Sequence, residues 1–426
     1  MERGISVLGM FSILAIAWAL SSNRRAIRWR PVVVGSLLQL VFAVIILRTE
    51  PGREVFDVAG RLISRFLGFT NVGASFVFGN LVNRNVPVGM PDAAGNLTQL
   101  AQTVAQTGAG FAFSVLPTII FFSSFITILY HFGILQRLVG LFAKLMVKFM
   151  GTSGTESLSA SANIFVGQTE APLLIRPYVS SMTMSELMAV MTGGFATIAG
   201  GAMAAYVGMG ISAKHLLAAS VMSAPAALVM AKLMFPETEK SKTAGSVDIE
   251  IERPWSNVID AAASGAADGL KLALNVGAML IAFVALIALV DWPLGKLGVW
   301  VGYPALSLNV ILGYVCRPLA WVMGVPWADA RNVGTLIGIK TAVNEFVGYA
   351  EMRTMIANGA LSYRAQVIAT YALCGFSNFS SIAIQIGGIG GMAPERKADL
   401  AKLGLRAMVA GSLACFQTAT IAGFLL

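Results

Sequence analysis

Long runs of apolar residues follow one another along most of the chain, separated by short polar connections. Runs of about 18 or more apolar residues are typical of helices that cross a bilayer. The pattern predicts about eight such helices, at residues 4–21, 31–47, 109–130, 185–206, 215–235, 268–292, 366–386 and 405–426. We therefore expect an all-α polytopic membrane protein.

Two further apolar regions are too short to cross as single helices. Residues 154–180 hold two arms that join at Gly167, Gln168 and Thr169, and residues 326–352 hold two arms that join at Asn344 and Glu345. An arm of roughly 10–14 residues, at about 1.5 Å per residue, covers only about half of a ~30 Å hydrocarbon core. The pattern predicts two re-entrant hairpins. Glu170 and Pro172 then fall in the first turn of a second arm, where a carboxylate and a proline are both favourable.

Each predicted hairpin is followed by two predicted helices, which indicates an inverted repeat with a binding site near the membrane midplane. The first helix after each hairpin is interrupted by glycine or polar residues. Gly193-Gly194 and Gly200-Gly201 interrupt one helix, and Gly375 with Ser377, Asn378, Ser380 and Ser381 interrupts the other. Unwound backbone at membrane depth is tolerated where it is buried or lines a polar cavity, although small residues also serve close helix packing.

This layout divides the chain into four parts. We expect scaffold helices, a surface helix and a long external loop in 1–148, and the first hairpin repeat in 149–235. A cytoplasmic loop and a long scaffold helix follow in 236–325, and the second hairpin repeat occupies 326–426. The surface helix is predicted by the helical spacing of Val55, Val58, Leu62 and Phe66 in the loop 48–108.

Composition and charge agree with a membrane protein. Hydrophobic residues make up 56% of the chain, charged residues 12%, and the net charge is +9. The basic residues are scattered over short connections such as 23–30, as the positive-inside rule predicts, which argues against nucleic-acid binding. The same rule places the protein across the cell (inner) membrane, as a multi-pass protein with both termini outside.

The polar residues favour transport over other membrane functions. The three cysteines and two histidines form no metal or catalytic spacing, and no G-x-S-x-G motif supports an intramembrane enzyme. A channel needs a continuous polar path, whereas two hairpins that close a site favour alternating access. Carboxylates inside a membrane are functional candidates because their burial is expensive. Glu156 is expected to form a capping box with Ser153, and Lys340 to be a charge partner or a snorkelling side chain.

Three motifs carry a family resemblance. GQTEAP at 167–172, NEFV at 344–347 and GFSNFSS at 375–381 resemble signature stretches of the concentrative nucleoside transporters, in their prokaryotic form. The resemblance implies a homotrimer in the lipid bilayer that carries a nucleoside together with a cation, usually Na+, and needs no other cofactor. Coupling to protons stays open as an alternative, as does the choice between purines and pyrimidines.

The resemblance also implies roles for individual residues. Gln168, Thr169 and Glu170 are expected at the base, Glu345, Asn378 and Ser381 at the ribose, and Phe376 packed on the base. Asn163, Thr197 and the carbonyls of Val166 and Ile198 are expected to bind Na+, with Thr197 standing where the family often has serine. The chemistry of these residues agrees, because a carboxylate can accept from both ribose hydroxyls and neutral oxygens suit a hard cation.

Overall fold

The computed structural model describes residues 2–83, 85–91, 93–94, 97–106, 111–245 and 255–426. Parts of the predicted external loop, residues 109–110 of a predicted span and residues 246–254 of the predicted cytoplasmic loop lie outside this set. In chain order, the α-helices are α1 (Glu2–Ala19), α2 (Trp29–Arg48), α3 (Glu50–Gly68), α4 (Thr70–Phe78), α5 (Leu116–His131), α6 (Ile134–Met150), α7 (Gly154–Ala162), α8 (Met184–Ala196), α9 (Gly200–Gly208), α10 (Ala213–Met234), α11 (Val258–Trp300), α12 (Leu308–Val322), α13 (Ala330–Ala342), α14 (Glu345–Ala357), α15 (Tyr363–Leu373), α16 (Phe379–Met392) and α17 (Lys397–Leu425).

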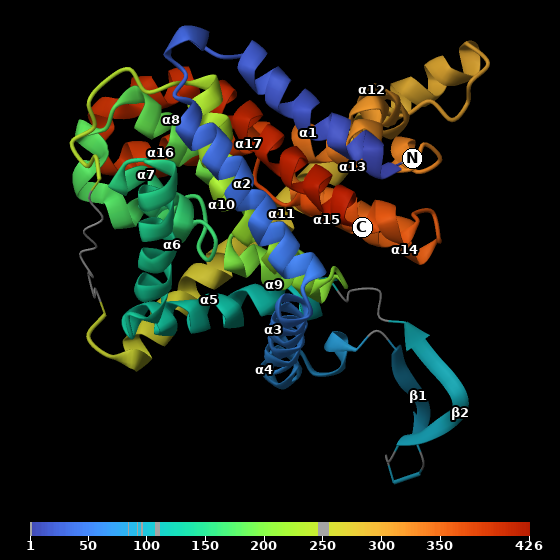
Figure 1. Cartoon of the computed structure of the whole chain (residues 1–426). Helices are drawn as coiled ribbons and strands as arrows, with labels where there is room; N and C mark the ends of the chain where they lie inside the picture. Colours follow the sequence, from blue (N-terminus) through green and yellow to red (C-terminus); the bar gives the residue numbers. More distant parts are fainter. Residues whose placement is uncertain (1, 84, 92, 95–96, 107–110, 246–254) are drawn as a thin grey trace.

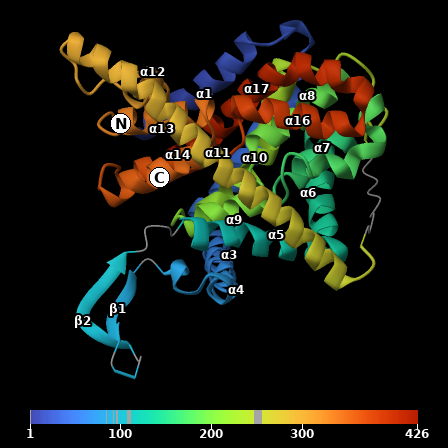
Figure 2. The same ribbon diagram turned by 180° about the vertical axis from the view of Figure 1, so that it is seen from behind.

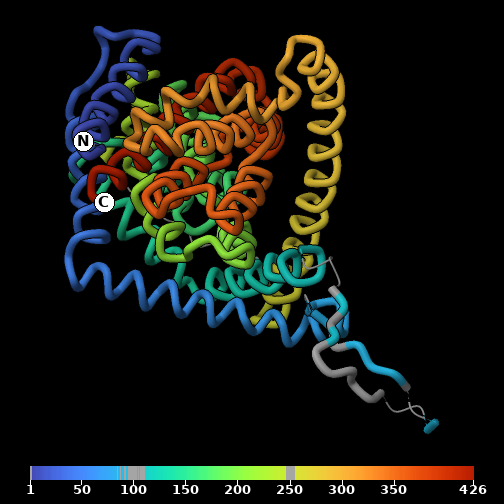
Figure 3. Tube along the Cα trace, turned by 90° about the vertical axis from the view of Figure 1, so that its right-hand side faces the viewer, coloured from blue at the N-terminus to red at the C-terminus, as the bar shows by residue number. Residues whose placement is uncertain are grey.

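Within the described part of the chain, eight helical stretches are long and apolar enough to cross a membrane. Seven of them coincide with predicted spans. The other, Glu50–Val82, falls on the segment predicted as a surface helix, and Figure 3 shows this segment running crosswise to α11. The predicted span 366–386 is instead divided between α15 and α16, because the polar run after Gly375 ends one helix before the next begins.

The expectation of an all-α protein is wrong in one region. Strands β1 (Asn85–Pro91) and β2 (Leu97–Gln106) pair antiparallel, with an irregular register between Pro87 and Gly89. Figure 1 shows this pair projecting away from the helical body. The β-branched residues Val86, Val88, Thr98, Thr103 and Val104 favour extended backbone. The fold is therefore mostly helical, with one two-stranded sheet.

In each region predicted to form a re-entrant hairpin, two short helices pack against each other. The first joins α7 to the 3₁₀ helix η4 (Ala171–Ser181), with Pro172 near its start, and the second joins α13 to α14. The helix after each hairpin is broken as predicted. Residues 197–199 separate α8 from α9, and residues 374–378 separate α15 from α16. The order of hairpin, broken helix and continuous helix therefore occurs twice, ending in α10 and in α17.

The continuous helices of the two repeats form the centre of the molecule. The most apolar windows of α8–α9, α10 and α17 are 89%, 89% and 83% buried, whereas that of α11 is only 11% buried. Figures 2 and 3 show α11 at the periphery of the helical body. Small residues (alanine, glycine, serine, threonine and cysteine) make up most of the buried face of α17, so its backbone can approach α8, α10 and α15 closely. The repeats therefore supply the core, and α11 presents its apolar surface outward.

The two ends of the chain lie together (Figure 1). Helix α1 packs along α17, and the Arg3 side chain donates a hydrogen bond of 2.7 Å to the Leu426 carbonyl. The termini therefore lie on the same side of the molecule.

Candidate functional site

The two broken helices meet at their breaks. The backbone N–H of Phe376 donates to the carbonyl of Thr197 at 3.3 Å. The Cys415 thiol on α17 contacts the carbonyls of Cys374 at 2.9 Å and Ala196 at 3.5 Å, one at each break. These bonds satisfy carbonyls that a helix end leaves without an intrahelical partner. The unwound segments are thus held against each other in the buried core.

Gly375 allows this close crossing. Its φ is +150°, a backbone conformation that residues with a side chain rarely adopt. A β-carbon at this position would lie 2.6 Å from the Phe195 carbonyl oxygen and 2.6 Å from the Cys415 sulfur. The glycine in GFSNFSS is therefore required by the approach of the two breaks.

A buried carboxylate lies beside this crossing. Glu345 is 2% exposed and is the first residue of α14. It accepts a hydrogen bond of 2.9 Å from the Asn378 amide and one of 3.1 Å from the Tyr206 hydroxyl. Asn378 also caps α16, because its side-chain oxygen accepts from the backbone N–H of Ser381. The N-terminal ends of α14 and α16 therefore both adjoin the carboxylate, and helix N-termini favour negative charge.

The tip of the first hairpin joins the same polar cluster. The Gln168 amide nitrogen lies 3.4 Å from the Ser381 hydroxyl, and its carbonyl oxygen accepts from Gln385 at 3.0 Å. Gln168 is 7% exposed and Ser381 is 2% exposed. Amide and hydroxyl groups from both repeats are thus brought together in the interior, where they can donate to or accept from a polar ligand.

The other predicted base-binding residues lie at the edge of this cluster. Thr169 packs on α16, where its methyl group would be 2.9 Å from a β-carbon added to Gly388. Phe376 is half-buried, within the second break. Glu170 is exposed and lines a cavity of about 270 Å³ together with Val166 and Asp268. Glu170 thus lies at this cavity, whereas Gln168 is bonded to Ser381 and Gln385 on α16.

The predicted cation-binding residues lie around the end of the first hairpin arm and the first break. The Asn163 side-chain nitrogen donates to the Ser159 carbonyl at 3.0 Å and lies against Gly193. Thr197 adjoins the same turn, since its hydroxyl donates to the Gly193 carbonyl at 2.8 Å. Asn163 is fully buried, and its side-chain oxygen has no hydrogen-bond donor. A buried acceptor without a donor is costly, so this oxygen is available to a bound ion or water.

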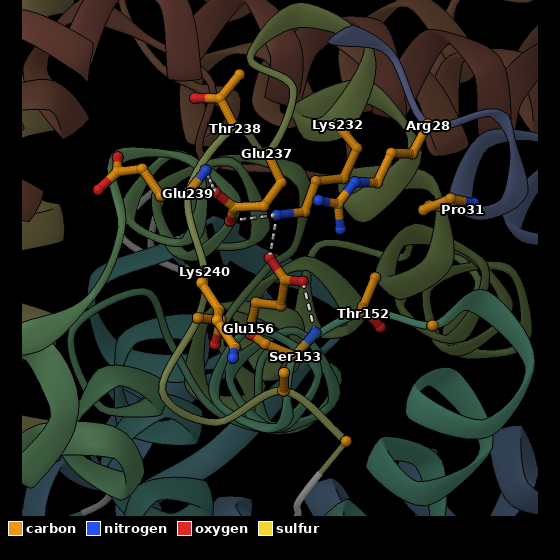
Figure 4. Close-up of a pocket in the computed structure, with 14 residues that line it drawn as sticks. Arg28, Pro31, Thr152, Ser153, Glu156, Lys232, Glu237, Thr238, Glu239 and Lys240 are labelled. Atoms are coloured by element: carbon orange, nitrogen blue, oxygen red, sulfur yellow. Dashed lines mark hydrogen bonds and ion pairs between the residues drawn. The ribbon is translucent and has the colours of Figure 1, made fainter.

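A second charged cluster lies at the start of the first hairpin (Figure 4). Glu156 accepts from the Ser153 backbone at 2.7 Å, forming the predicted capping box, and pairs with Lys232 at 2.6 Å. Lys232 lies 3.6 Å from Glu237, beside a cavity of about 400 Å³. Because Glu156 and Lys232 are buried and paired, and Glu237 adjoins them, this cluster ties α7 to the end of α10 and to the following connection. Its role is structural.

The structure thus brings together Gln168, Glu345, Asn378 and Ser381, and separately Asn163 and Thr197. The sequence analysis missed Tyr206, Gln385 and Cys415. The spacing of Asn378, Ser381 and Gln385 places the three on one face of α16 and could have indicated Gln385. Tyr206 and Cys415 gave no comparable signal, because each is a single residue in an apolar run.

Comparison with known proteins identifies the family. Residues 8–81 and 215–423 match the N-terminal and C-terminal parts of a family described as Na+ dependent nucleoside transporter, and residues 112–213 match a family described as nucleoside recognition. The chain is 48% identical over 422 residues to an uncharacterized transporter of Haemophilus influenzae, covering 98% of this chain and 96% of that protein. It is 42% identical over 438 residues to sodium/nucleoside cotransporter 1 of Mus musculus, covering 100% of this chain but only 64% of the longer mouse protein.

Solved structures agree with these matches. The transporter CNTnw in an inward-facing substrate-bound state has a TM-score of 0.90 and 44% identity, covering 100% of this chain and 98% of that one. A doubly substituted variant of CNTnw in an outward-facing state also has a TM-score of 0.90, with 43% identity and the same coverage. The chain therefore belongs to the Na+-dependent nucleoside transporter family, whose members are membrane transporters and not enzymes.

Proposed function

We propose that this protein carries nucleosides across the cell (inner) membrane together with Na+, by alternating access. The observation that carries the proposal is the buried polar cluster in which two hairpins and two broken helices meet. Gln168 comes from the first hairpin, Glu345 from the second, and Asn378 and Ser381 from the second break. A nucleoside is neutral and offers a polar base edge and two ribose hydroxyls, which such a cluster can bind.

Glu345 is the group that we assign to the ribose. Its two oxygens are held by Tyr206 and Asn378 at 3.1 Å and 2.9 Å, so the carboxylate is oriented before a ligand arrives. A carboxylate has about four lone-pair sites and can accept further hydrogen bonds from two hydroxyls. Gln168, Thr169 and Glu170 at the hairpin tip are assigned to the base, and Phe376 to its aromatic face.

Na+ is assigned to the end of the first hairpin arm. The ligands are the Asn163 side-chain oxygen, the Thr197 hydroxyl and the carbonyls of Val166 and Ile198. The Asn163 side-chain N–H donates to the Ser159 carbonyl. The Asn163 side-chain oxygen therefore points away from that carbonyl, toward the proposed Na+ site, where it can accept. Neutral oxygens favour a metal cation over a proton, which needs a titratable group.

The wider arrangement is also proposed. Two re-entrant hairpins gate the site, and the repeats 149–235 and 326–426 move against the scaffold parts 1–148 and 236–325. The protein is a homotrimer with both termini outside, and the exposed apolar surface of α11 suits lipid or a neighbouring subunit. The bond between Arg3 and Leu426 supports a common side for the termini.

Uptake by reconstituted vesicles tests the proposed function. We expect labelled uridine or adenosine to accumulate under an inward Na+ gradient at constant pH, and unlabelled nucleoside to compete. Vesicles without protein provide the background. Accumulation that ignores Na+ but follows an imposed pH gradient would replace Na+ with the proton as the coupling ion. No accumulation under either gradient would contradict secondary transport.

A further inference from the structure

Among the described residues, Lys340 is the only basic side chain of hairpin 2 (the second hairpin, α13 and α14) that is fully buried. It lies in the last turn of α13, is 0% exposed, and donates a hydrogen bond of 2.8 Å to the Ala372 carbonyl. Its ammonium nitrogen also lies 5.9 Å from the centre of the Phe416 ring, which is within the range of a cation–π contact. A buried lysine is costly unless its charge is compensated, so this position calls for an explanation.

Lys340 belongs to the last turn of one helix, and its ammonium bonds to the C-terminal end of another. Its own helix, α13, ends at Ala342, and α15, which supplies the Ala372 carbonyl, ends at Leu373. The last carbonyls of a helix lack intrahelical partners and carry the negative end of the helix dipole. Two such ends that converge in a membrane-embedded core repel each other unless a positive charge lies between them. Lys340 supplies that charge.

The first repeat has the same convergence of helix ends without a lysine. The arm α7 ends at Ala162, next to Asn163, and the broken helix α8 ends at Ala196, next to Thr197. Arg176 is the only basic residue between positions 149 and 213, and it is exposed. Here the Asn163 side-chain oxygen is left without a donor. The junction of a hairpin arm with a broken helix therefore contains a covalently attached cation in the second repeat and none in the first.

We propose that the Lys340 ammonium is a tethered cation that takes, in the second repeat, the place that an exchangeable cation takes in the first. It is a positioning residue. By joining α13 to the end of α15, it fixes Glu345 at the hairpin tip relative to Asn378 after the break. The inference rests on the proposed cation site at Asn163 and Thr197 and adds an asymmetry to it. The second hairpin is thus held to its broken helix by a fixed charge, and the first hairpin by an exchangeable one.

The experiment removes the tethered charge and supplies a free one. Lys340→Ala leaves a space that matches a lysine side chain, so a small organic cation of the same charge can enter it. We expect methylammonium to raise the thermal unfolding temperature of purified K340A, measured without Na+ and without nucleoside. Tetramethylammonium, which cannot donate hydrogen bonds, should not raise it. Neither ion should stabilise the wild type or Thr341→Val, a control on the same hairpin arm.

Nucleoside binding provides the second measurement. Lys340→Met keeps most of the side-chain volume without the charge, and we expect it to weaken nucleoside binding about tenfold or more, in line with losing a hydrogen bond from a charged group. In K340A, methylammonium should restore most of the nucleoside binding. If a second Na+ fills the vacated position as well, nucleoside binding to K340A should depend sigmoidally on Na+ concentration.

The outcomes separate this inference from the proposed function. Wild-type uptake under a Na+ gradient reports the proposed function alone, whereas the response of K340A to methylammonium alone needs no Na+ or substrate. Wild-type nucleoside affinity in K340M would overturn the tethered-cation role. So would a K340A protein whose stability and nucleoside binding do not respond to methylammonium. If K340M is recovered only as aggregate, the stability measurement on K340A decides.

Discussion

At the scale of single residues, the site is defined by polar side chains whose partners lie far away in the sequence. Glu345 is held by Tyr206 and Asn378, and Gln168 by Ser381 and Gln385. Inside a membrane protein each of these groups needs a partner, because an unsatisfied polar group costs several kcal/mol in hydrocarbon. The cluster is therefore ordered in advance, and a ligand gains specificity from groups that are already oriented.

Glu345→Gln tests the ribose assignment. A glutamine can keep the bonds to Asn378 and Tyr206, because its oxygen accepts and its nitrogen can donate to the tyrosine oxygen. The cost of about 1.5–3 kcal/mol should therefore fall on the ribose, as expected for a hydrogen bond to a charged group. Nucleosides that lack a ribose hydroxyl should lose affinity in the wild type but far less in E345Q, as measured by competition binding.

The matched control for this substitution is Glu351→Gln, which lies farther along the same helix, α14. It should bind both kinds of nucleoside as the wild type does. If deoxynucleosides lose the same affinity in the wild type and in E345Q, the carboxylate does not read the ribose.

At the scale of elements, the breaks in α8–α9 and α15–α16 create the site. Each break exposes carbonyls at one helix end and N–H groups at the next helix start. Carbonyl ends converge where Asn163 and Lys340 lie, and helix starts adjoin Glu345. The helix dipoles at the breaks therefore favour positive charge on one side of the crossing and the carboxylate on the other.

Gly375→Ala should disrupt this crossing. The added β-carbon meets the Phe195 carbonyl and the Cys415 sulfur, and the φ of +150° is strained for alanine, at a cost of about 1–3 kcal/mol or more. We expect a lower unfolding temperature and weakened nucleoside binding. Gly387→Ala is the control, because a β-carbon there contacts nothing within 4 Å and alanine favours the helix. Equal behaviour of the two variants would show that the crossing tolerates separation.

At the scale of the whole molecule, the proposed cation and nucleoside sites are distinct, but they are joined where the two breaks meet. Thr197, assigned to the cation, accepts through its carbonyl from the backbone of Phe376, which is assigned to the nucleoside. A cation that orders the first break therefore also orders the second. Any such coupling is reciprocal, because each ligand changes the affinity of the other by the same factor.

Asn163→Ala should weaken this coupling. In the wild type, Na+ should tighten nucleoside binding in detergent by about 1–3 kcal/mol, a typical coupling free energy, and the effect should shrink in N163A. The ranking of different nucleosides should stay the same, because Asn163 is assigned only to the cation. Thr192→Val on α8 is the control, since its hydroxyl donates to the Met188 carbonyl of the same helix at 2.7 Å. A full Na+ effect in N163A would place the ion elsewhere.

The sequence by itself determined that this is a membrane protein, where seven of the eight membrane-length helical stretches of the described chain lie, and where two helices are broken. These are local properties, since apolar runs set the spans, and glycine, proline and polar residues interrupt them within a few positions. The motifs around Gln168, Glu345 and Asn378 could likewise be recognised from the sequence, because each is a short polar run in an apolar region. The β-hairpin and helices α6 and α12 were missed, because charged, proline or glycine residues interrupt their apolar patterns.

Only the tertiary structure decided which of these residues meet. Tyr206 reaches Glu345 across 139 positions, and Cys415 reaches Ala196 across 219. The role of Lys340 also depended on its partner, because a lysine in an apolar run has the same sequence pattern whether it snorkels or caps a helix end. A helix periodicity reports which face of a segment is apolar, but the neighbour that covers this face is chosen by packing of the whole bundle. For this reason the sequence pattern did not predict that the two breaks cross, and only the structure shows it.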